Sequence, residues 1–426
     1  MKGLVISWYF PPINSSEGLV TFKLLKNSNY TYDVFTQKNN KSWTYGAEEK
    51  KLISKNINTI FGVSKNINEW VNEGIAFFEK NKDKYDFIMS RSMAPESHEI
   101  ALAIKQKYPN IKWIASFGDP IKDNPYELFT HKSNPNKVLG NGLLDYSIKY
   151  IFSPKRILKS ILWKYRTKTY IKNNTRELRD KKLQDDVFEY ADRIILNNQY
   201  QKNHMLKSSN IKEDKVIVLP HTFDEDFYNY KLSNKNDKIV MSYIGHCDDI
   251  RTPKPLLDAI KRLKETIPNL NEKLIVNFYG NFPNMDKIVI IDNQIEDIVK
   301  VNKTVTYFDS LDIMRKSNWL LLIDANLSRF IDKNIFFAAK IADYLGSKRN
   351  ILGITMYDGA SADILRKTDN IVSSHSVEEI YINLLSIING KIKEHDYNAD
   401  EYNAKNVAKI YDNMVKELIK VKNEKN

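Results

Sequence analysis

The segment NIFFAAKIADYLGSKRNILGI, residues 334–354, holds the pattern from which the rest of the chain can be interpreted. It reads as a short loop, a helix that begins near Ala338 or Ala339, a Gly-Ser-Lys break and a buried strand. The helix carries Lys340 in its first turn and Asp343 three residues later, so both side chains share one face. A helix N-terminus attracts anions, because its unpaired N–H groups and its dipole favour negative charge. The segment predicts a nucleotide diphosphate site with Asp343 on the ribose; an ordinary ion pair on a solvated face is the alternative.

The composition restricts the classes of protein to which the chain can belong. It has 426 residues, 42% of them hydrophobic, which suits two or three domains with apolar cores. Its 65 basic and 53 acidic residues leave a net charge of +12, which favours an anionic partner such as a nucleotide, nucleic acid or an acidic membrane surface. The single cysteine, Cys247, excludes an intrachain disulfide and fits a reducing cytoplasm. No run of about 18 apolar residues occurs, so no transmembrane helix is expected and a cytoplasmic location is predicted.

The first half of the chain alternates between strand and helix patterns. An apolar strand over residues 3–8 is followed by a loop of small residues that includes Ser16 and Gly18, and then by a helix over residues 19–26. The alternation continues to about residue 228 and predicts a doubly wound parallel sheet, in which ligands lie at the carboxyl ends of the strands. The GxGxxG fingerprint of dinucleotide-binding proteins is absent.

Two polar residues of this half are candidates for chemistry. Asp119 comes just after a strand predicted over residues 112–117, where a sheet of this kind places its reactive groups. His98 lies on a helix predicted over residues 95–108, behind the end of another strand. The alternatives are a turn-forming role for Asp119 and an ordinary satisfied side chain for His98. No pair of carboxylates suited to acid and base catalysis is evident from the sequence.

Residues 120–190 interrupt the alternation with an unusually basic segment. Residues 148–174 contain eight basic and no acidic side chains, interleaved with aromatic and aliphatic ones. A basic amphipathic helix of this kind is typical of a membrane interface, where each basic residue contributes about 1 kcal/mol near an anionic surface. A helix that packs on the core and turns a basic face to solvent is the alternative.

The second half repeats the strand–helix alternation after a polar run at residues 229–238. Strands are predicted over residues 238–245, 273–279, 305–308 and 319–323. Arg251 lies just before a helix over residues 255–266, where it could reach an anion at the helix N-terminus. We therefore predict a first domain over residues 1–228, a second over 238–397, and a C-terminal helix over 398–426.

Five segments, taken in order, resemble a glycosyltransferase of family 4 (glycosyl transferases group 1). They are SWYFPPINSSEG (7–18), ADRIILNN (191–198), VIVLPHTFDEDFY (216–228), YIGHCDDIRTPKPLLDA (243–259) and FFAAKIADYLGSKRNIL (336–352). The resemblance implies an α/β protein of the GT-B type, with two Rossmann-like domains of doubly wound parallel sheet and a cleft between them. It implies a retaining transfer of a sugar from a nucleotide-sugar donor to a glycan acceptor, in bacterial surface polysaccharide or glycoconjugate synthesis. In this family the C-terminal helix often crosses back onto the first domain.

The resemblance also assigns roles to individual residues. Together with the residues chosen by position, among them His98, the candidate donor contacts are Ser16, Gly18, Gly245, Arg251, Lys340 and Asp343, and the candidates for the chemistry are Asp119, His98, Arg251 and Lys340. Asp119 falls at the His-Asp pair of the family, with Gly118 in place of the histidine. The chain departs from the family at the first glutamate of its E-x7-E motif, which is Ile335, and at the Pro-Ser before Lys340. These two positions are Ala338 and Ala339, and Lys348 stands where the family has a glycine.

The expected mechanism depends on charge and position. Arg251, Lys340 and the helix N-terminus would stabilise the leaving diphosphate as its negative charge develops. No metal and no cofactor are expected, since no His, Cys and Asp residues stand at metal-ligand spacing. A UDP-sugar is the expected donor and a GDP-sugar the alternative. The expected acceptor is a glycan or a lipid-linked glycan, which the protein would reach at a membrane surface through residues 148–174. Nucleic acid is not expected as a partner. The competing functions are a non-catalytic GT-B partner protein and a sugar-nucleotide epimerase.

Overall fold

The computed structural model describes most of the chain. The described residues are 1–13, 15–38, 48–125, 174–232, 237–248 and 250–423. The basic segment predicted to lie at a membrane falls outside them except for its last residue, so that assignment stays a prediction. Among the described residues, no helix is both long enough and apolar enough to cross a membrane.

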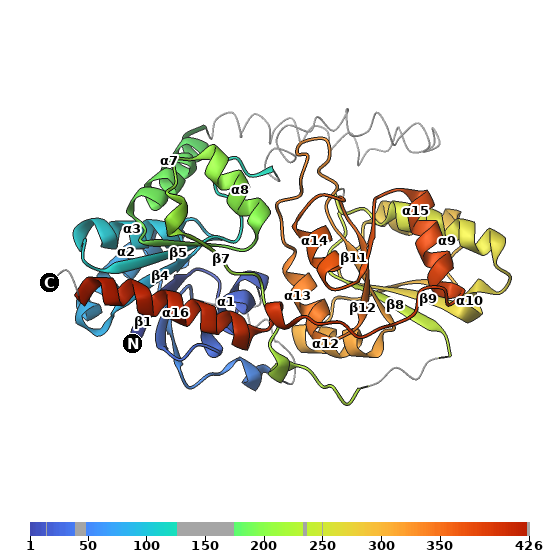
Figure 1. Ribbon diagram of the computed structural model, residues 1–426, viewed down its shortest axis with the longest axis horizontal. Coiled ribbons are helices and arrows are strands. Elements are labelled where there is room, and N and C mark those ends of the chain that lie inside the picture. Colours follow the sequence, from blue (N-terminus) through green and yellow to red (C-terminus); the bar gives the residue numbers. More distant parts are fainter. Residues whose placement is uncertain (14, 39–47, 126–173, 233–236, 249, 424–426) are drawn as a thin grey trace.

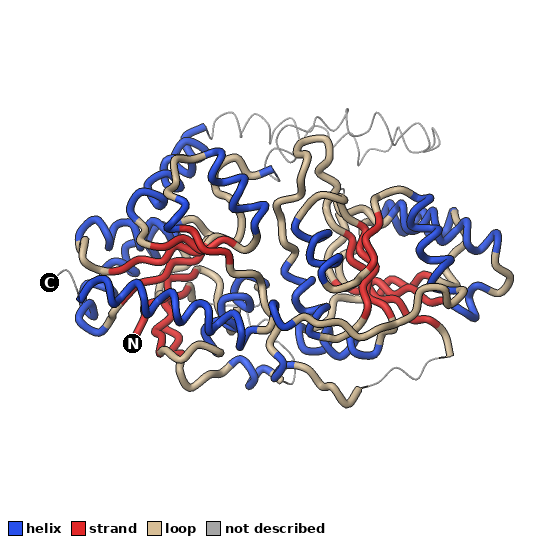
Figure 2. The backbone as a smooth tube through the Cα atoms, in the orientation of Figure 1, coloured by secondary structure: helices blue, strands red, loops and turns tan. Residues whose placement is uncertain are grey.

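The first domain contains one parallel sheet of seven strands in the order β3-β2-β1-β4-β5-β6-β7. The strands are β1 (Lys2–Ser7), β2 (Thr31–Thr36), β3 (Ile57–Phe61), β4 (Phe87–Arg91), β5 (Lys112–Ser116), β6 (Arg193–Leu196) and β7 (Val216–Val218). The helices are α1 (Ser16–Lys26), α2 (Ile67–Asn81), α3 (Glu96–Lys107), α7 (Asn174–Tyr190) and α8 (Gln199–Ser208). Because side chains alternate along a strand, Val5 of β1 packs toward one face and its neighbours Leu4 and Ile6 toward the other. Both faces are covered by helices, as Figures 1 and 2 show.

The second domain contains six parallel strands in the order β10-β9-β8-β11-β12-β13. The strands are β8 (Ile239–Ile244), β9 (Leu274–Tyr279), β10 (Val299–Asn302), β11 (Trp319–Ile323), β12 (Asn350–Ile354) and β13 (Ile371–Ser373). The helices are α9 (Lys254–Thr266), α10 (Leu270–Lys273), α11 (Asn284–Asp292), α12 (Tyr307–Lys316), α13 (Ala339–Gly346), α14 (Ala360–Lys367) and α15 (Val377–Ile388). In each sheet the first strand lies between its successor and a strand that comes later in the chain. This reversal of strand order is the place where doubly wound sheets bind ligands.

The two predicted doubly wound sheets are confirmed, and the predicted start of the helix that carries Lys340 agrees with α13. The strand predicted over residues 305–308 is wrong, because Thr306 instead caps α12 by accepting a hydrogen bond from the Asp309 N–H. The prediction also missed β3 and β10. Both are short strands at an edge of their sheet and expose part of their side chains, so neither has the continuous apolar pattern of a buried strand.

The two domains share a hydrophobic core on one side of the molecule. Phe22 of α1 belongs to the same buried cluster as Phe308 of α12 and Ile341 of α13. The C-terminal helix α16 (Ala404–Asn423) crosses back and lies against α1 of the first domain (Figure 1). Its Asp412 carboxylate accepts a hydrogen bond from the Ser28 hydroxyl, and its Leu418 is buried in the shared core. Helices α1 and α13 therefore pack into the same core, which fixes their positions relative to each other.

Candidate active site

The side chain of Lys340 lies at the N-terminal end of α13, against the end of β8. Its ammonium nitrogen is 4.3 Å from the centre of the Tyr243 ring and 3.1 Å from the Tyr243 hydroxyl. A cation over an aromatic face is attracted by the ring electrons without being neutralised. In the described part of the chain, no carboxylate lies within ion-pair distance of Lys340. The positive charge of Lys340 is therefore available for an anionic ligand.

Gly245 follows β8 and comes close to the same ammonium group. Its φ of +145° is unfavourable for residues other than glycine, and a Cβ there would lie 2.3 Å from Lys340 Nζ. The structure thus brings together Gly245 and Lys340, two of the residues predicted to contact the donor. A glycine at this position lets the backbone approach a ligand closely while leaving room for the lysine.

The protonation of Lys340 is sensitive to its surroundings. Burial and the nearby positive charge of Arg251 together lower the pKa of Lys340 to about 8. A bound diphosphate would act in the opposite direction, because an anion stabilises the protonated amine. Binding of such a ligand is therefore expected to depend on pH near neutrality.

The N-terminus of α13 offers backbone donors beside Lys340. No side chain caps this helix, and residues 338–340 are partly exposed. The Ile341 N–H already donates to the Ala338 carbonyl at 2.9 Å, so the N–H groups of Ala339 and Lys340 are the ones that could donate to an oxyanion. The Ala338–Ala339 pair, which replaces a Pro-Ser of the resembled family, leaves this end uncapped.

Arg251 lies in the loop after β8, and its charge acts on groups of both domains. Its backbone N–H donates to Asp248 Oδ1 at 2.7 Å, and its Nη1 lies 3.5 Å from Asp248 Oδ2. Its charge lowers the pKa of Lys340 on its own domain and also acts on the carboxyl of Asp119 in the first domain. Arg251 is therefore close to both Lys340 and Asp119, on the two sides of the cleft.

Asp119 follows β5 at the carboxyl edge of the first sheet and is partly exposed. Burial and the nearby Glu17 carboxylate raise the pKa of Asp119 to about 7, while Arg91 and Arg251 oppose the rise. A carboxyl group with such a pKa can both accept and donate a proton near neutral pH. Asp119 is therefore a candidate for proton transfer.

Glu17 is a residue that the sequence did not single out. It lies in the first turn of α1, and its Oε2 accepts a hydrogen bond from Arg91 Nε at 2.9 Å. Its charge acts on the carboxyl of Asp119, a relation between two carboxylates that the sequence did not show. The available signal was an acidic residue between Ser16 and Gly18, but its partner Asp119 is about a hundred residues away in the chain.

His98 lies inside the first domain and is fully buried. Its Nδ1 is 2.7 Å from the Ser90 hydroxyl, which also accepts a hydrogen bond from the Trp113 indole N–H. Burial and the charge of Arg91 lower the pKa of His98 to about 3, so the imidazole is neutral. This placement gives His98 partners within the core and no exposed surface from which to reach a substrate.

Asp343 lies on the side of α13 that faces the first domain. Its Oδ1 is 2.8 Å from Lys23 Nζ of α1 and 3.0 Å from the Tyr307 hydroxyl. The Tyr228 hydroxyl donates to its backbone carbonyl at 2.9 Å. The carboxylate predicted to hold a ribose is therefore engaged in an interdomain ion pair, of which the Lys23 side chain is only 2% exposed.

Ser16 and Gly18 occupy the first turn of α1 but differ in exposure. Ser16 is exposed, whereas Gly18 is buried and packs on the preceding turn. A Cβ at position 18 would lie 3.0 Å from the Phe10 Cα, so a glycine there allows α1 to approach that turn. Ser16 is thus the one of the two that could contact a ligand directly.

The residue at the family's first glutamate position, Ile335, is buried in a small apolar cluster with Leu327, Phe336 and Met356. Its backbone carbonyl accepts a hydrogen bond from Asn198 Nδ2 of the first domain at 2.8 Å. This position therefore joins the two domains, and its side chain provides no polar group for a sugar hydroxyl.

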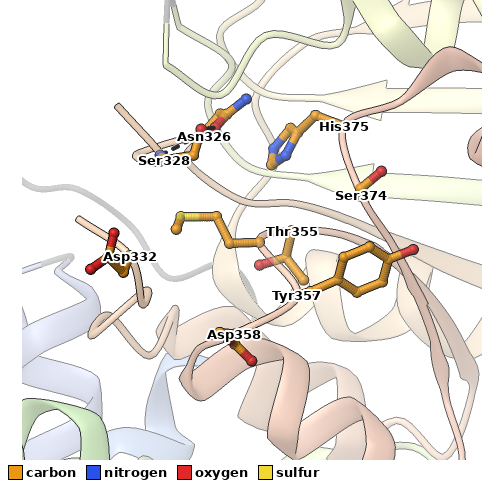
Figure 3. Close-up of a pocket in the computed structure, with 9 residues that line it drawn as sticks. Asn326, Ser328, Asp332, Thr355, Tyr357, Asp358, Ser374 and His375 are labelled. Carbon is orange, nitrogen blue, oxygen red and sulfur yellow. Dashed lines mark hydrogen bonds between the residues drawn. The ribbon is translucent and has the colours of Figure 1, made fainter. Parts of the chain in front are cut away.

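A separate open pocket of about 320 Å³ lies at the carboxyl ends of β11, β12 and β13 (Figure 3). The residues that line it are Asn326, Ser328, Asp332, Thr355, Met356, Tyr357, Asp358, Ser374 and His375. The His375 ring is held by a 3.1 Å contact between its Nε2 and the Asp324 carbonyl. None of the predicted site residues lines this pocket. Among the described residues, no group of three or more His, Cys, Asp or Glu side chains is arranged to hold a metal ion.

Comparisons with solved structures identify the fold. Sucrose-phosphate synthase from Thermosynechococcus elongatus matches with a TM-score of 0.68 and 10% identity over 99% of each chain. The lipopolysaccharide outer core galactosyltransferase WaaB matches with a TM-score of 0.60 and 12% identity over 98% of this chain and 99% of its own. UDP-GlcNAc 2-epimerase from Neisseria meningitidis, solved with UDP-GlcNAc bound, matches with a TM-score of 0.57 and 13% identity over 98% of this chain and 100% of its own. No protein-family model and no curated protein matches the sequence.

These likenesses confirm the predicted GT-B fold. They extend over nearly the whole chain, so the two sheets and their relative arrangement are shared. At 10–13% identity they establish architecture rather than activity, and the same fold serves both transferases and epimerases. The function must therefore be argued from the residues in the cleft.

Proposed function

We propose that this protein transfers a sugar from a nucleotide-sugar donor to a glycan acceptor. The observation that carries the proposal is the arrangement of Lys340 against Gly245 at the uncapped N-terminus of α13. Arg251 lies close enough to influence both this group and Asp119 of the first domain. The result is a cationic site for a leaving diphosphate on one side of the cleft and a base for an acceptor hydroxyl on the other.

The second domain would hold the donor. The ammonium of Lys340, the guanidinium of Arg251 and the first N–H groups of α13 would contact the diphosphate oxygens. Their positive charge is present before reaction, so it stabilises the diphosphate as the bond to the sugar breaks. This role requires no metal ion. A UDP-sugar is the donor that we propose first, because three of the structural neighbours are named as UDP-GlcNAc 2-epimerases.

Asp119 would act on the acceptor. The O–H bond of the acceptor breaks and its proton passes to the Asp119 carboxylate. The acceptor oxygen bonds to the anomeric carbon, and the bond from that carbon to the diphosphate breaks, with its electron pair leaving on the diphosphate. Retention of the anomeric configuration is proposed from the family resemblance alone, and it requires the acceptor hydroxyl to attack from the face of the sugar that the diphosphate leaves.

Polysaccharide or glycoconjugate synthesis at the cytoplasmic face of a membrane is the setting that we propose. It rests on the net charge of +12 and on the basic segment over residues 148–174. Flotation of the purified protein with vesicles containing anionic lipids tests it, and a variant lacking these residues is the matched control. Equal flotation of the two proteins would contradict a role for this segment.

An epimerase is the second candidate, and one observation favours it. Glu17 and Asp119 form a carboxylate pair next to the site proposed for the diphosphate, and an enzyme that inverts a sugar carbon needs groups to remove and return protons. Incubation with UDP-GlcNAc in the absence of any acceptor, followed by proton NMR, distinguishes the two reactions. A new nucleotide sugar would favour the epimerase. If the donor stays unchanged without an acceptor and is consumed once a glycan acceptor is added, the result supports transfer.

The first experiment is a binding screen. We expect one of the UDP-, GDP-, ADP- and CMP-sugars to raise the melting temperature of the wild-type protein. The Lys340→Met variant should show a much smaller shift with the same compound. If no nucleotide sugar raises the melting temperature, the proposal fails in favour of a non-catalytic partner protein, the third possibility for this fold.

A further inference from the structure

Glu17 is held in one orientation by Arg91. Both Nε and Nη2 of Arg91 contact Glu17 Oε2, at 2.9 and 2.7 Å, and Nη1 donates to the Ser116 hydroxyl at 2.9 Å. The Arg91 side chain is 5% exposed and Glu17 is 18% exposed. The Nε contact is a charge-assisted hydrogen bond and the Nη2 contact is an ion pair to the same oxygen, so a buried cation holds one oxygen of the Glu17 carboxylate.

The Glu17 carboxylate fills the space above Gly118. A Cβ at position 118 would lie 2.9 Å from both carboxylate oxygens of Glu17. The backbone of Gly118 is itself fixed, since its N–H donates to the Ser92 hydroxyl at 2.9 Å and its carbonyl accepts from Gln201 Nε2 at 3.1 Å. Asp119 is the next residue, so its position relative to Glu17 is set by the fold.

Three charged groups from three different elements act on Asp119. They are Glu17 on α1, Arg91 on β4 and Arg251 in the loop after β8. The two arginines favour the ionised carboxylate of Asp119, and Glu17 favours the protonated carboxyl. Glu17 is thus the only one of the three whose charge opposes ionisation of Asp119.

We propose that Glu17 is a positioning residue that acts through Asp119. Held by Arg91 in the space that a larger residue at 118 would occupy, its charge adds to the effect of burial and moves to higher pH the range in which Asp119 exchanges a proton with the bound substrate. This inference rests on the proposed role of Asp119, but the charge relation between Glu17 and Asp119 can be measured whether or not transfer occurs.

The sign of the effect follows from the charges. Asp119 must be ionised to accept a proton, so the rate should rise as pH passes through its pKa, which is about 7. The Glu17→Gln substitution removes the charge that opposes ionisation and leaves Arg91 without its ionic partner. Both changes lower the pKa of Asp119. The acidic limb of the kcat/KM profile should therefore move to lower pH by at least about half a unit.

The test begins with a readout that does not require activity. The carboxyl carbon of Asp119 is followed by carbon NMR against pH in the full chain labelled with 13C-aspartate, and its signal is identified by its loss in Asp119→Asn. We expect its titration midpoint to fall in Glu17→Gln and to stay near the wild-type value in Glu17→Asp, which keeps the charge. An unchanged midpoint in a folded Glu17→Gln variant would overturn the proposal.

The kinetic profile then separates the two proposals. If the NMR midpoint and the acidic limb of kcat/KM both fall in Glu17→Gln, Glu17 acts through Asp119 in the reaction. If the midpoint falls in a protein that transfers no sugar, the relation between Glu17 and Asp119 holds and the proposed transferase function is what fails. If the protein is active and the midpoint falls but the limb stays in place, Glu17 does not act in catalysis through Asp119 and the inference is rejected.

Discussion

The two halves of the cleft are built on the same plan but place different groups at the candidate site, a carboxyl on the first domain and an ammonium on the second. In both sheets the first strand lies beside its successor and a later strand, so the loops after β1 and β8 occupy equivalent places. The first sheet places the partly exposed carboxyl of Asp119 at this edge, after β5. On the second sheet the corresponding group is the ammonium of Lys340 beside Gly245.

The difference arises from the partners of the positively charged side chain in each half. Arg91 of the first domain is buried, and Glu17 and Ser116 accept its hydrogen bonds, so little of its charge is left for a ligand. Lys340 of the second domain contacts a tyrosine ring and hydroxyl, neither of which neutralises it. Topology therefore determines where polar residues gather, and the partners of each side chain determine which charge remains.

The largest expected effect tests the first half of the cleft. The Asp119→Asn substitution removes the proposed proton acceptor and should lower kcat by about 10²- to 10⁴-fold. The affinity for the donor should change little, because the donor is assigned to the other domain. Steady-state kinetics and calorimetric titration of the donor measure the two quantities. A loss of less than about tenfold in kcat would contradict the assignment of Asp119 as the base.

The next effect tests how much the ion pair between Lys23 and Asp343 stabilises the contact between the two domains. The Lys23→Met substitution leaves the Asp343 carboxylate without its cation in a nearly buried position, and should lower the free energy of unfolding by about 3–5 kcal/mol. Chemical denaturation measures this. The matched control is Lys367→Met, which breaks an exposed pair with Glu401 and should cost less than about 1 kcal/mol. Similar losses in the two variants would mean that the interdomain pair contributes little.

A smaller effect tests the second half. The Lys340→Met substitution removes a charged hydrogen-bond donor to the diphosphate and should weaken nucleotide-sugar binding by about 10- to 150-fold. The exposed Lys264 of the same domain provides the control, since Lys264→Met should leave the affinity as it is. Calorimetric titration of both variants gives the comparison. Unchanged affinity in Lys340→Met would place the diphosphate elsewhere.

The smallest effect concerns pH. Lys340 is protonated below its pKa of about 8 and loses its charge above it, so donor affinity should fall as pH rises through 8, by up to about tenfold per pH unit. Binding should be accompanied by proton uptake near pH 8, which titration in two buffers of different ionisation enthalpy detects. In Lys340→Met both effects should disappear. If they persist in that variant, another group is responsible for the pH dependence.

Local patterns in the sequence were sufficient for the architecture and for part of the site. Apolar periodicity and turn residues predicted two parallel doubly wound sheets, because a buried strand and an amphipathic helix each leave a regular pattern in a few residues. The same local signals placed Lys340 in the first turn of α13. They failed for the edge strands β3 and β10, whose partial exposure removes the pattern.

The partners of the charged residues depended on the tertiary structure. Asp343 meets Lys23, which is 320 residues away, because α1 and α13 pack across the domain interface. Glu17 lies over Gly118, next to Asp119, because α1 begins at the edge of the sheet where the parallel strands β1 and β5 both end. Charge, burial and proton affinity at each of these groups follow from which neighbours the packing supplies. A single sequence records the residue types, but the distances between residues far apart in the chain exist only after the domains have folded and docked.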